Sequence, residues 1–161
     1  MMLITACPAW VIGQNSASTT VATKASVIDI IKLIKVDDMN FGKISNGASG
    51  TVEVTTDGER NSTGITTVGV SGWAPAKFEV RGANNYEYII GLPNDITIEN
   101  GDYIIMIKGL VARASDATEN GLTGIIKPDS YFTVGGKLII ESATLPIGSY
   151  TKSFEVSAGY N

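Results

Sequence analysis

The chain has 161 residues, of which 43% are hydrophobic and 17% charged, and its formal net charge is −4. This length allows one domain with a sizeable core. The lysines and arginines are scattered singly, which argues against a basic surface for nucleic acid. The absence of histidine removes the commonest general base and the usual metal ligand. We therefore expect a globular domain that is not an enzyme, with no cofactor or metal site and no nucleic-acid partner.

Residues 1–13 are almost entirely apolar and carry no charge. The run is too short to span a bilayer, which takes about 20 residues, and it is typical of the hydrophobic region of a secretory signal peptide. No basic residue precedes it, so we expect the signal to be truncated at its start. Cleavage before Gln14 suits the small residue at that point and predicts export. The alternative is a lipoprotein signal in which Cys7, the only cysteine, carries the lipid; a first buried strand is a third interpretation.

The next stretch, residues 14–27, has small or β-branched residues at every second position. Alternation with a period of two is typical of extended backbone, so we predict an extended N-terminal arm. Residues 28–36 then carry isoleucine, leucine or valine on both parities, which favours a strand buried on both faces or one that changes sheets. The alternating residues of the arm are Ala17, Thr19, Val21, Thr23, Ala25 and Val27.

Turn signals rich in glycine and asparagine punctuate the rest of the chain, and the strands they separate recur roughly every eight to twelve residues, as in a β-sandwich. We predict hairpin turns at Asp57-Gly58 and at Gly135-Gly136. We expect an exposed loop over residues 112–130, with one short strand at 122–126. No window predicts an amphipathic helix. The other predicted strands cover residues 51–56, 65–71, 76–81, 86–91, 96–99, 103–107, 131–134 and 137–141.

The end of the chain alternates between apolar and polar residues. The apolar parity holds Tyr150, Phe154, Val156, Ala158 and Tyr160, and serine, threonine, glutamate and glycine lie between them. This pattern predicts a strand with one apolar face. A long apolar edge strand is normally an aggregation hazard, so in an exported protein it indicates pairing with another chain.

Several stretches together resemble a family of secreted bacterial β domains of unknown function. That family is similar to the pilins of chaperone–usher systems, including the archaic and spore-coat-like types. Such pilins end in an alternating apolar strand with tyrosine next to last and glycine fourteenth from the end, and here Tyr160 and Gly148 hold these positions. The stretches that carry the resemblance are residues 40–44 (Asn-Phe-Gly-Lys-Ile), 50–52, 57–60, 76–83, 131–138 and 148–161.

The resemblance implies an all-β, immunoglobulin-like (pilin-type) β-sandwich over residues 28–161 that lacks its final strand. It implies that the arm of a neighbouring subunit fills the gap, with residues 17–27 as the donor strand. One wall of the acceptor groove would then be the apolar parity from Tyr150 to Tyr160. The implied partners are copies of the chain or related subunits, with a periplasmic chaperone and an outer-membrane usher that assemble a fibre on the cell surface.

A second hypothesis is a monomeric surface module that fills its own groove and binds a glycan or a protein. Its candidate ligand contacts are Trp73, whose indole could stack on a sugar ring, and the loop over residues 112–130. Packing at the end of a sandwich is the alternative interpretation of Trp73. The acidic residues near Asp37 and Gly58 lack the spacing of a calcium loop, and we interpret them as turns.

Overall fold

The computed structural model describes residues 17–161. The predicted signal peptide, Cys7 and the first residues of the predicted arm lie outside this range. From residue 17 onward the chain forms twelve strands and no helix, so the prediction of an all-β chain is confirmed for these residues. Accordingly, no helix within this range is long and apolar enough to cross a membrane.

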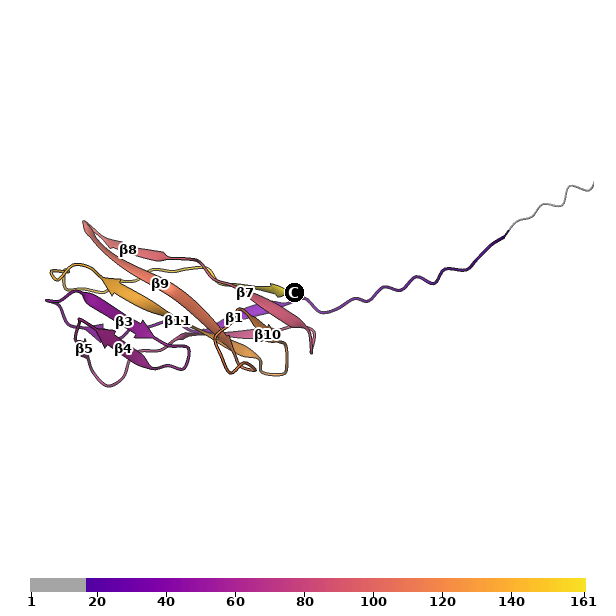
Figure 1. Cartoon of the computed structure of the whole chain (residues 1–161), viewed down its shortest axis with the longest axis horizontal. Coiled ribbons are helices and arrows are strands. Elements are labelled where there is room, and N and C mark those ends of the chain that lie inside the picture. The colour runs from indigo at the N-terminus through magenta and orange to yellow at the C-terminus, as the bar shows by residue number, and fades with distance from the viewer. Residues whose placement is uncertain (1–16) are drawn as a thin grey trace, which may run out of the picture.

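The larger layer is a seven-stranded antiparallel sheet (Figure 1). Its strands are β1 (Lys32–Asp37), β3 (Gly50–Val54), β4 (Arg60–Thr63), β6 (Ala76–Arg81), β8 (Ile96–Asn100), β9 (Tyr103–Ala114) and β11 (Tyr131–Ile140). One edge of β11 pairs with β9, which pairs with β8. The other edge changes partner midway, because its first half pairs with β6 and its second half with β3. β1 and β4 flank β6 and β3.

Two smaller sheets complete the fold. Three strands form one of them in the order β10 (Thr123–Ile125), β7 (Glu87–Gly91) and β12 (Ser157–Tyr160). Two short strands form the other, β2 (Lys43–Ile44) and β5 (Thr67–Val68). Since all pairings are antiparallel, each strand can bury one face, and β6 does so with alternate residues inside.

The core consists of two clusters that differ in what covers them. In the first cluster the large sheet packs against the three-stranded sheet, so that Phe78 stacks on Phe132 at 5.2 Å between ring centroids and Tyr88 lies beside them. In the second cluster the three-stranded sheet does not face the isoleucines and leucine of β8, β9 and β11. Half-buried side chains cover them instead, namely Phe41, Ile44, Ala48, Leu145, Tyr150 and Phe154.

Several boundaries differ from those predicted. The prediction of a turn at Gly135-Gly136 is wrong, because both glycines lie inside β11. There, a Cβ at Gly135 would be 2.5 Å from the carbonyl oxygen of Val54. The predicted loop over 112–130 is shorter, because β9 continues to Ala114. The predicted C-terminal strand pairs only over its last four residues, β12. The hairpin turn at Asp57-Gly58 is confirmed by hydrogen bonds between Thr55 and the two residues Gly58 and Glu59.

Residues 17–30 form no strand or helix, and all of them are exposed. They run away from the sheets as one extended segment, which leaves the body at the pole where β7, β10 and the C-terminus lie (Figure 1). Val21, Val27 and Ile30 are 77%, 97% and 73% exposed. These three apolar side chains are therefore largely open to solvent, whereas Ile28 is 38% exposed.

Candidate functional site

The second core cluster, whose buried residues are covered by half-buried side chains, borders a groove of about 1440 Å³. Its floor is made by alternate residues of three neighbouring strands, Ile98 of β8, Ile105 and Ile107 of β9, and Leu138 and Ile140 of β11. These residues meet because β9 pairs with both β8 and β11, in registers that place Ile107 beside Leu138 and Ile105 beside Ile140. The floor is therefore wholly aliphatic.

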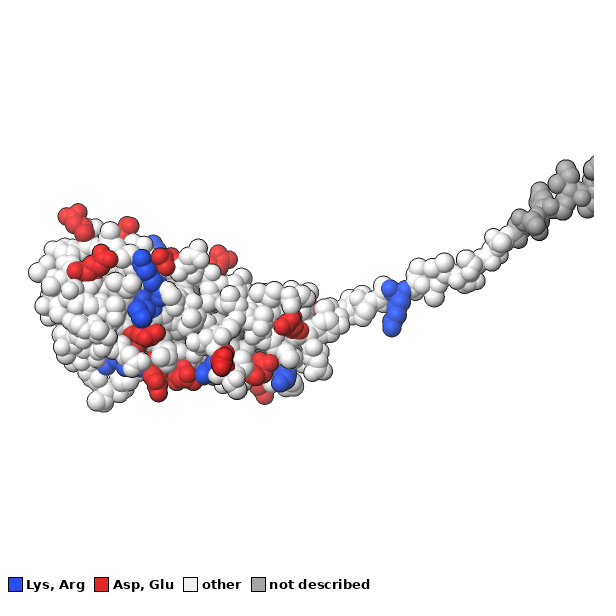
Figure 2. Space-filling model, in the orientation of Figure 1, with Lys and Arg blue, Asp and Glu red and all other residues white. Residues whose placement is uncertain are grey.

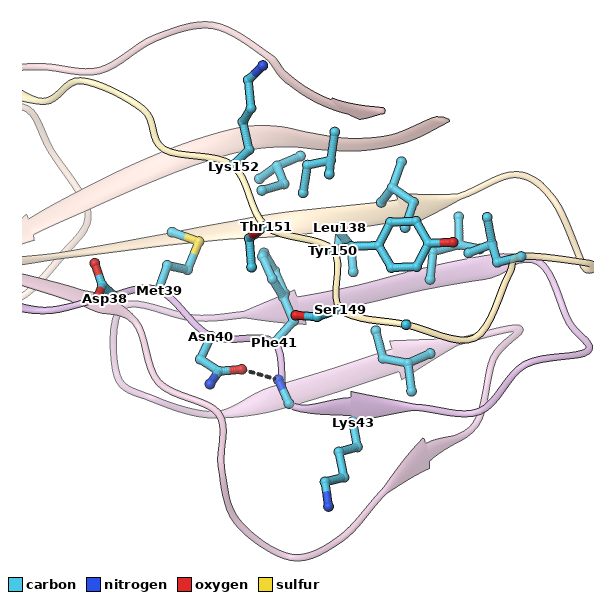
Figure 3. A pocket seen from close by; sticks show the side chains of 18 of the residues that line it. Asp38, Met39, Asn40, Phe41, Lys43, Leu138, Ser149, Tyr150, Thr151 and Lys152 are labelled. Carbon is cyan, nitrogen blue, oxygen red and sulfur yellow. Dashed lines mark hydrogen bonds between the residues drawn. The ribbon is translucent and has the colours of Figure 1, made fainter. Parts of the chain in front are cut away.

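Residues 38–44 form the first wall of the groove. Met39, Phe41 and Ile44 contribute half-buried apolar side chains, and Phe41 points in between the two walls in Figure 3. The segment is fastened on its outer side, where Asn40 and Ala74 exchange two backbone hydrogen bonds of 2.8 and 2.9 Å and β2 pairs with β5.

Residues 145–154 form the second wall, with Leu145, Tyr150 and Phe154 as its apolar side chains. Within the described chain, no backbone hydrogen bond joins residues 145–156 to another segment. The hydroxyl of Tyr150 donates a hydrogen bond of 2.9 Å to the carbonyl of Pro146, within the wall itself. Most residues of this wall are exposed, so its backbone groups are open to solvent.

The predicted wall residues lie in two different places. Tyr150 and Phe154 line the groove, and so does Gly148. Val156, Ala158 and Tyr160 instead pack against the first core cluster, because β12 pairs with β7 and so enters the closed half of the molecule. Along the C-terminal segment, the earlier apolar residues thus line the groove and the later ones pack in the closed core.

Tyr160 connects the closed core with the start of the exposed segment. Its hydroxyl donates a hydrogen bond of 2.7 Å to the carbonyl of Asp29 and accepts one of 2.8 Å from the N–H of Ala83. Its ring meets Tyr86 edge to face at 5.8 Å. The tyrosine next to the chain end therefore fixes the point at which residues 17–30 leave the body.

The predicted donor residues are all exposed and lie outside the groove. They are Ala17, Thr19, Val21, Thr23, Ala25 and Val27. The structure therefore places the groove and the arm in one chain without bringing them together.

Trp73 is half-buried and already has partners. Its indole N–H donates a hydrogen bond of 3.1 Å to the carbonyl of Gly58, and the guanidinium carbon of Arg60 lies 4.0 Å from its ring centroid. One ring face is thus covered by an arginine. These contacts fit the packing interpretation of Trp73 better than that of a free platform for sugar stacking.

Charged groups lie at the rim of the groove and not on its floor. Lys35 and Asp38 form an exposed ion pair of 2.7 Å, while Lys43 and Lys152 point away from the cavity (Figure 3). On the face shown in Figure 2, acidic and basic side chains are interspersed. From residue 17 to 161, no three His, Cys, Asp or Glu side chains are placed to hold a metal ion. The groove is suited to an apolar, extended occupant.

Sequence reasoning did not identify the aliphatic floor, the wall at residues 38–44 or Arg60 as parts of a site. Phe41 and Gly42 lay within a stretch that carried the family resemblance, but the pattern gave them no role. The isoleucines at every second position, 96 and 98, then 105 and 107, are the signal that could have indicated a continuous apolar face.

Comparison with known proteins places the domain in a family. Neither the curated proteins nor the solved structures include one that matches the chain. A family model does match, over residues 31–160, which covers all the strands and leaves out the exposed segment. The chain therefore belongs to the family described as a domain of unknown function (DUF4402).

Proposed function

We propose that this protein is a structural subunit of an extracellular surface fibre, assembled by donor-strand complementation. The arm of one copy would occupy the groove of the next and complete an immunoglobulin-like, pilin-type sandwich that lacks one strand. The observation that carries this proposal is the wall at residues 145–154, whose backbone is unpaired and which borders an aliphatic floor.

The arm is long enough for the straight part of the second wall. Residues 17–27, extended at about 3.3 Å per residue, span about 36 Å, whereas the second wall bends at residues 147–148, so that residues 149–154 span about 20 Å on the same basis. The arm is also extended and fully exposed before it binds, so it needs no unfolding of the donor body. One arm can therefore pair with the straight part of the second wall.

The chemistry of the arm suits an aliphatic floor. Val21 and Val27 would each contribute about 1.5–3 kcal/mol if they became fully buried, and the alanines and threonines of the same parity would add less. Each backbone hydrogen bond formed with the second wall contributes a further 0.5–1.5 kcal/mol or so. The other parity of the arm carries Lys24 and serines, which would face solvent.

The positions of arm and groove allow subunits to join in a chain. The arm leaves from the pole formed by β7, β10 and the C-terminus (Figure 1), whereas the groove lies over the other core cluster. Donor and acceptor surfaces therefore differ, and head-to-tail contacts of this kind produce open filaments when they do not close into a ring.

A monomeric binding module receives less support. The ring of Trp73 stacks on Arg60 and its N–H is hydrogen-bonded to Gly58. The other candidate ligand contact, the loop over residues 112–130, is shorter than predicted because β9 extends to Ala114. The monomer hypothesis predicts that the arm folds back into the groove of its own chain. In the structure the arm lies in solvent.

Size measurements on the chain from residue 14 test the proposal. We expect polymers that survive denaturant concentrations at which the separated subunit unfolds. A double variant, Val21→Asp with Val27→Asp, should remain monomeric and folded, yet it should still bind a labelled peptide of residues 17–30. The control is a Ser18→Asp, Ser26→Asp variant, which adds the same charges on the solvent parity and should polymerise. The proposal would be refuted if the unsubstituted chain stayed monomeric and did not bind the peptide of residues 17–30.

A further inference from the structure

The outer side of the first groove wall is held by one arginine. Arg60, at the start of β4, donates a hydrogen bond of 3.4 Å from Nη1 to the carbonyl of Phe41 and one of 3.1 Å from Nη2 to the carbonyl of Gly69. Its guanidinium lies over Trp73, and the N–H of Trp73 is bonded to Gly58. Two loops and the wall thus meet at a single side chain.

The wall is shaped to receive this arginine. Gly42 has a φ of +76°, a conformation that favours glycine, and a Cβ at this position would lie 2.5 Å from Nη1 of Arg60. The N–H of Gly42 donates a hydrogen bond of 2.8 Å to the side-chain oxygen of Asn40 (Figure 3). The wall therefore turns beside Arg60, with space for the guanidinium on one side and Phe41 on the other.

We propose that Arg60, braced by Trp73, is a positioning residue that holds the Phe41 wall at the spacing required by an inserted strand. This inference rests on the proposed function, since the strand is the arm of another copy. Arginine suits the task because its planar fork can bond two carbonyls while its face stacks on an aromatic ring. Lysine offers one point charge and cannot make the same three contacts. Trp73 then acts inside the subunit and not on an external ligand.

The test compares three variants of the full mature chain, each with Val21→Asp and Val27→Asp in its own arm so that it cannot donate. Arg60→Lys and Trp73→Leu perturb the brace. Lys77→Met is the matched control, because Lys77 also lies over an aromatic ring, 4.2 Å from the centroid of Tyr131, but does not itself line the groove. We measure amide hydrogen exchange of residues 40–44, capture of the labelled arm peptide, and the unfolding midpoint.

We expect Arg60→Lys to speed exchange in residues 40–44 about tenfold and to weaken peptide capture about tenfold, each equivalent to about 1.4 kcal/mol. Its unfolding midpoint should fall by no more than this loss of free energy explains, and the Lys77→Met control should leave exchange in residues 40–44 and peptide capture unchanged. Trp73→Leu should produce the same local changes, which provides a second assay if one variant folds poorly. Unchanged exchange and capture in both brace variants would overturn the inference.

The two readouts separate this inference from the fibre proposal. Faster exchange in residues 40–44 without any peptide capture by the parent chain would support the brace and refute the fibre. Strong capture by the parent chain that neither brace variant weakens would support the fibre and overturn the role of Arg60.

Discussion

The hydroxyl of Tyr160 makes a sharp test of how the arm is anchored. It bridges the carbonyl of Asp29 and the N–H of Ala83, so Tyr160→Phe removes two hydrogen bonds and leaves the ring in place. Each such bond contributes about 0.5–1.5 kcal/mol, and Asp29 is exposed. We therefore expect a loss of about 1–2 kcal/mol, concentrated at the root of the arm.

The assay is hydrogen exchange combined with limited proteolysis at residues 29–31. A local loss of about 1.4 kcal/mol corresponds to about tenfold faster exchange. Tyr86→Phe is the matched control, because its ring is the edge-to-face neighbour of Tyr160 and its hydroxyl takes part in none of the hydrogen bonds described. Gly82→Ala should reproduce the effect, since a Cβ there would lie 2.6 Å from the Tyr160 hydroxyl. Equal exchange in Tyr160→Phe and Tyr86→Phe would refute the anchor.

Two further predictions concern the closed core. Tyr88 is fully buried and its hydroxyl has no hydrogen-bond partner within the described chain, so Tyr88→Phe should stabilise the fold by about 1 kcal/mol in thermal unfolding. Burial, aided by the charge of Asp116, raises the pKa of Tyr88 from 10 to about 12; the native protein then holds a proton that the unfolded chain loses, and stability should fall between pH 10 and 12 more steeply than in Tyr88→Phe. Gly135→Ala should destabilise the fold by about 2–3 kcal/mol, because its Cβ would meet Val54, whereas Gly121→Ala, with open space around it, should be neutral. A destabilised Tyr88→Phe or a neutral Gly135→Ala would contradict these expectations.

The strands that could be predicted well are those with one buried face. β6 begins and ends where its alternation does, because Phe78 and Val80 are buried while Lys77 and Glu79 are less so. The glycine pair at 135–136 could not be assigned from sequence, since glycine suits a turn and also a strand that runs very close to its neighbours. Here the second reason applies, as the backbone of Val54 leaves no space for a Cβ.

The site was predictable only in part, for a related reason. Alternation identified Tyr150 and Phe154, but it continued without interruption into Ala158 and Tyr160, which belong to the closed core. What divides them is the partner strand, because β7 pairs with residues 157–160 only. Such a limit is set by pairing between distant segments, which a single sequence does not display.

This division has a consequence for how the C-terminal segment should be understood. Tyr150, Phe154 and Val156 share one parity, which Lys152 interrupts, and the backbone of residues 150–156 is unpaired along both edges within the described chain. Alternating side chains separate into an inner and an outer face only where neighbouring structure determines which face is buried. Here only the floor of the groove does so. A second extended segment between this wall and residues 38–44 would supply the absent ladder beside the aliphatic floor. The length, exposure and parity of residues 17–27 meet that need, which is why the fibre proposal accounts for the arm and the incomplete wall together.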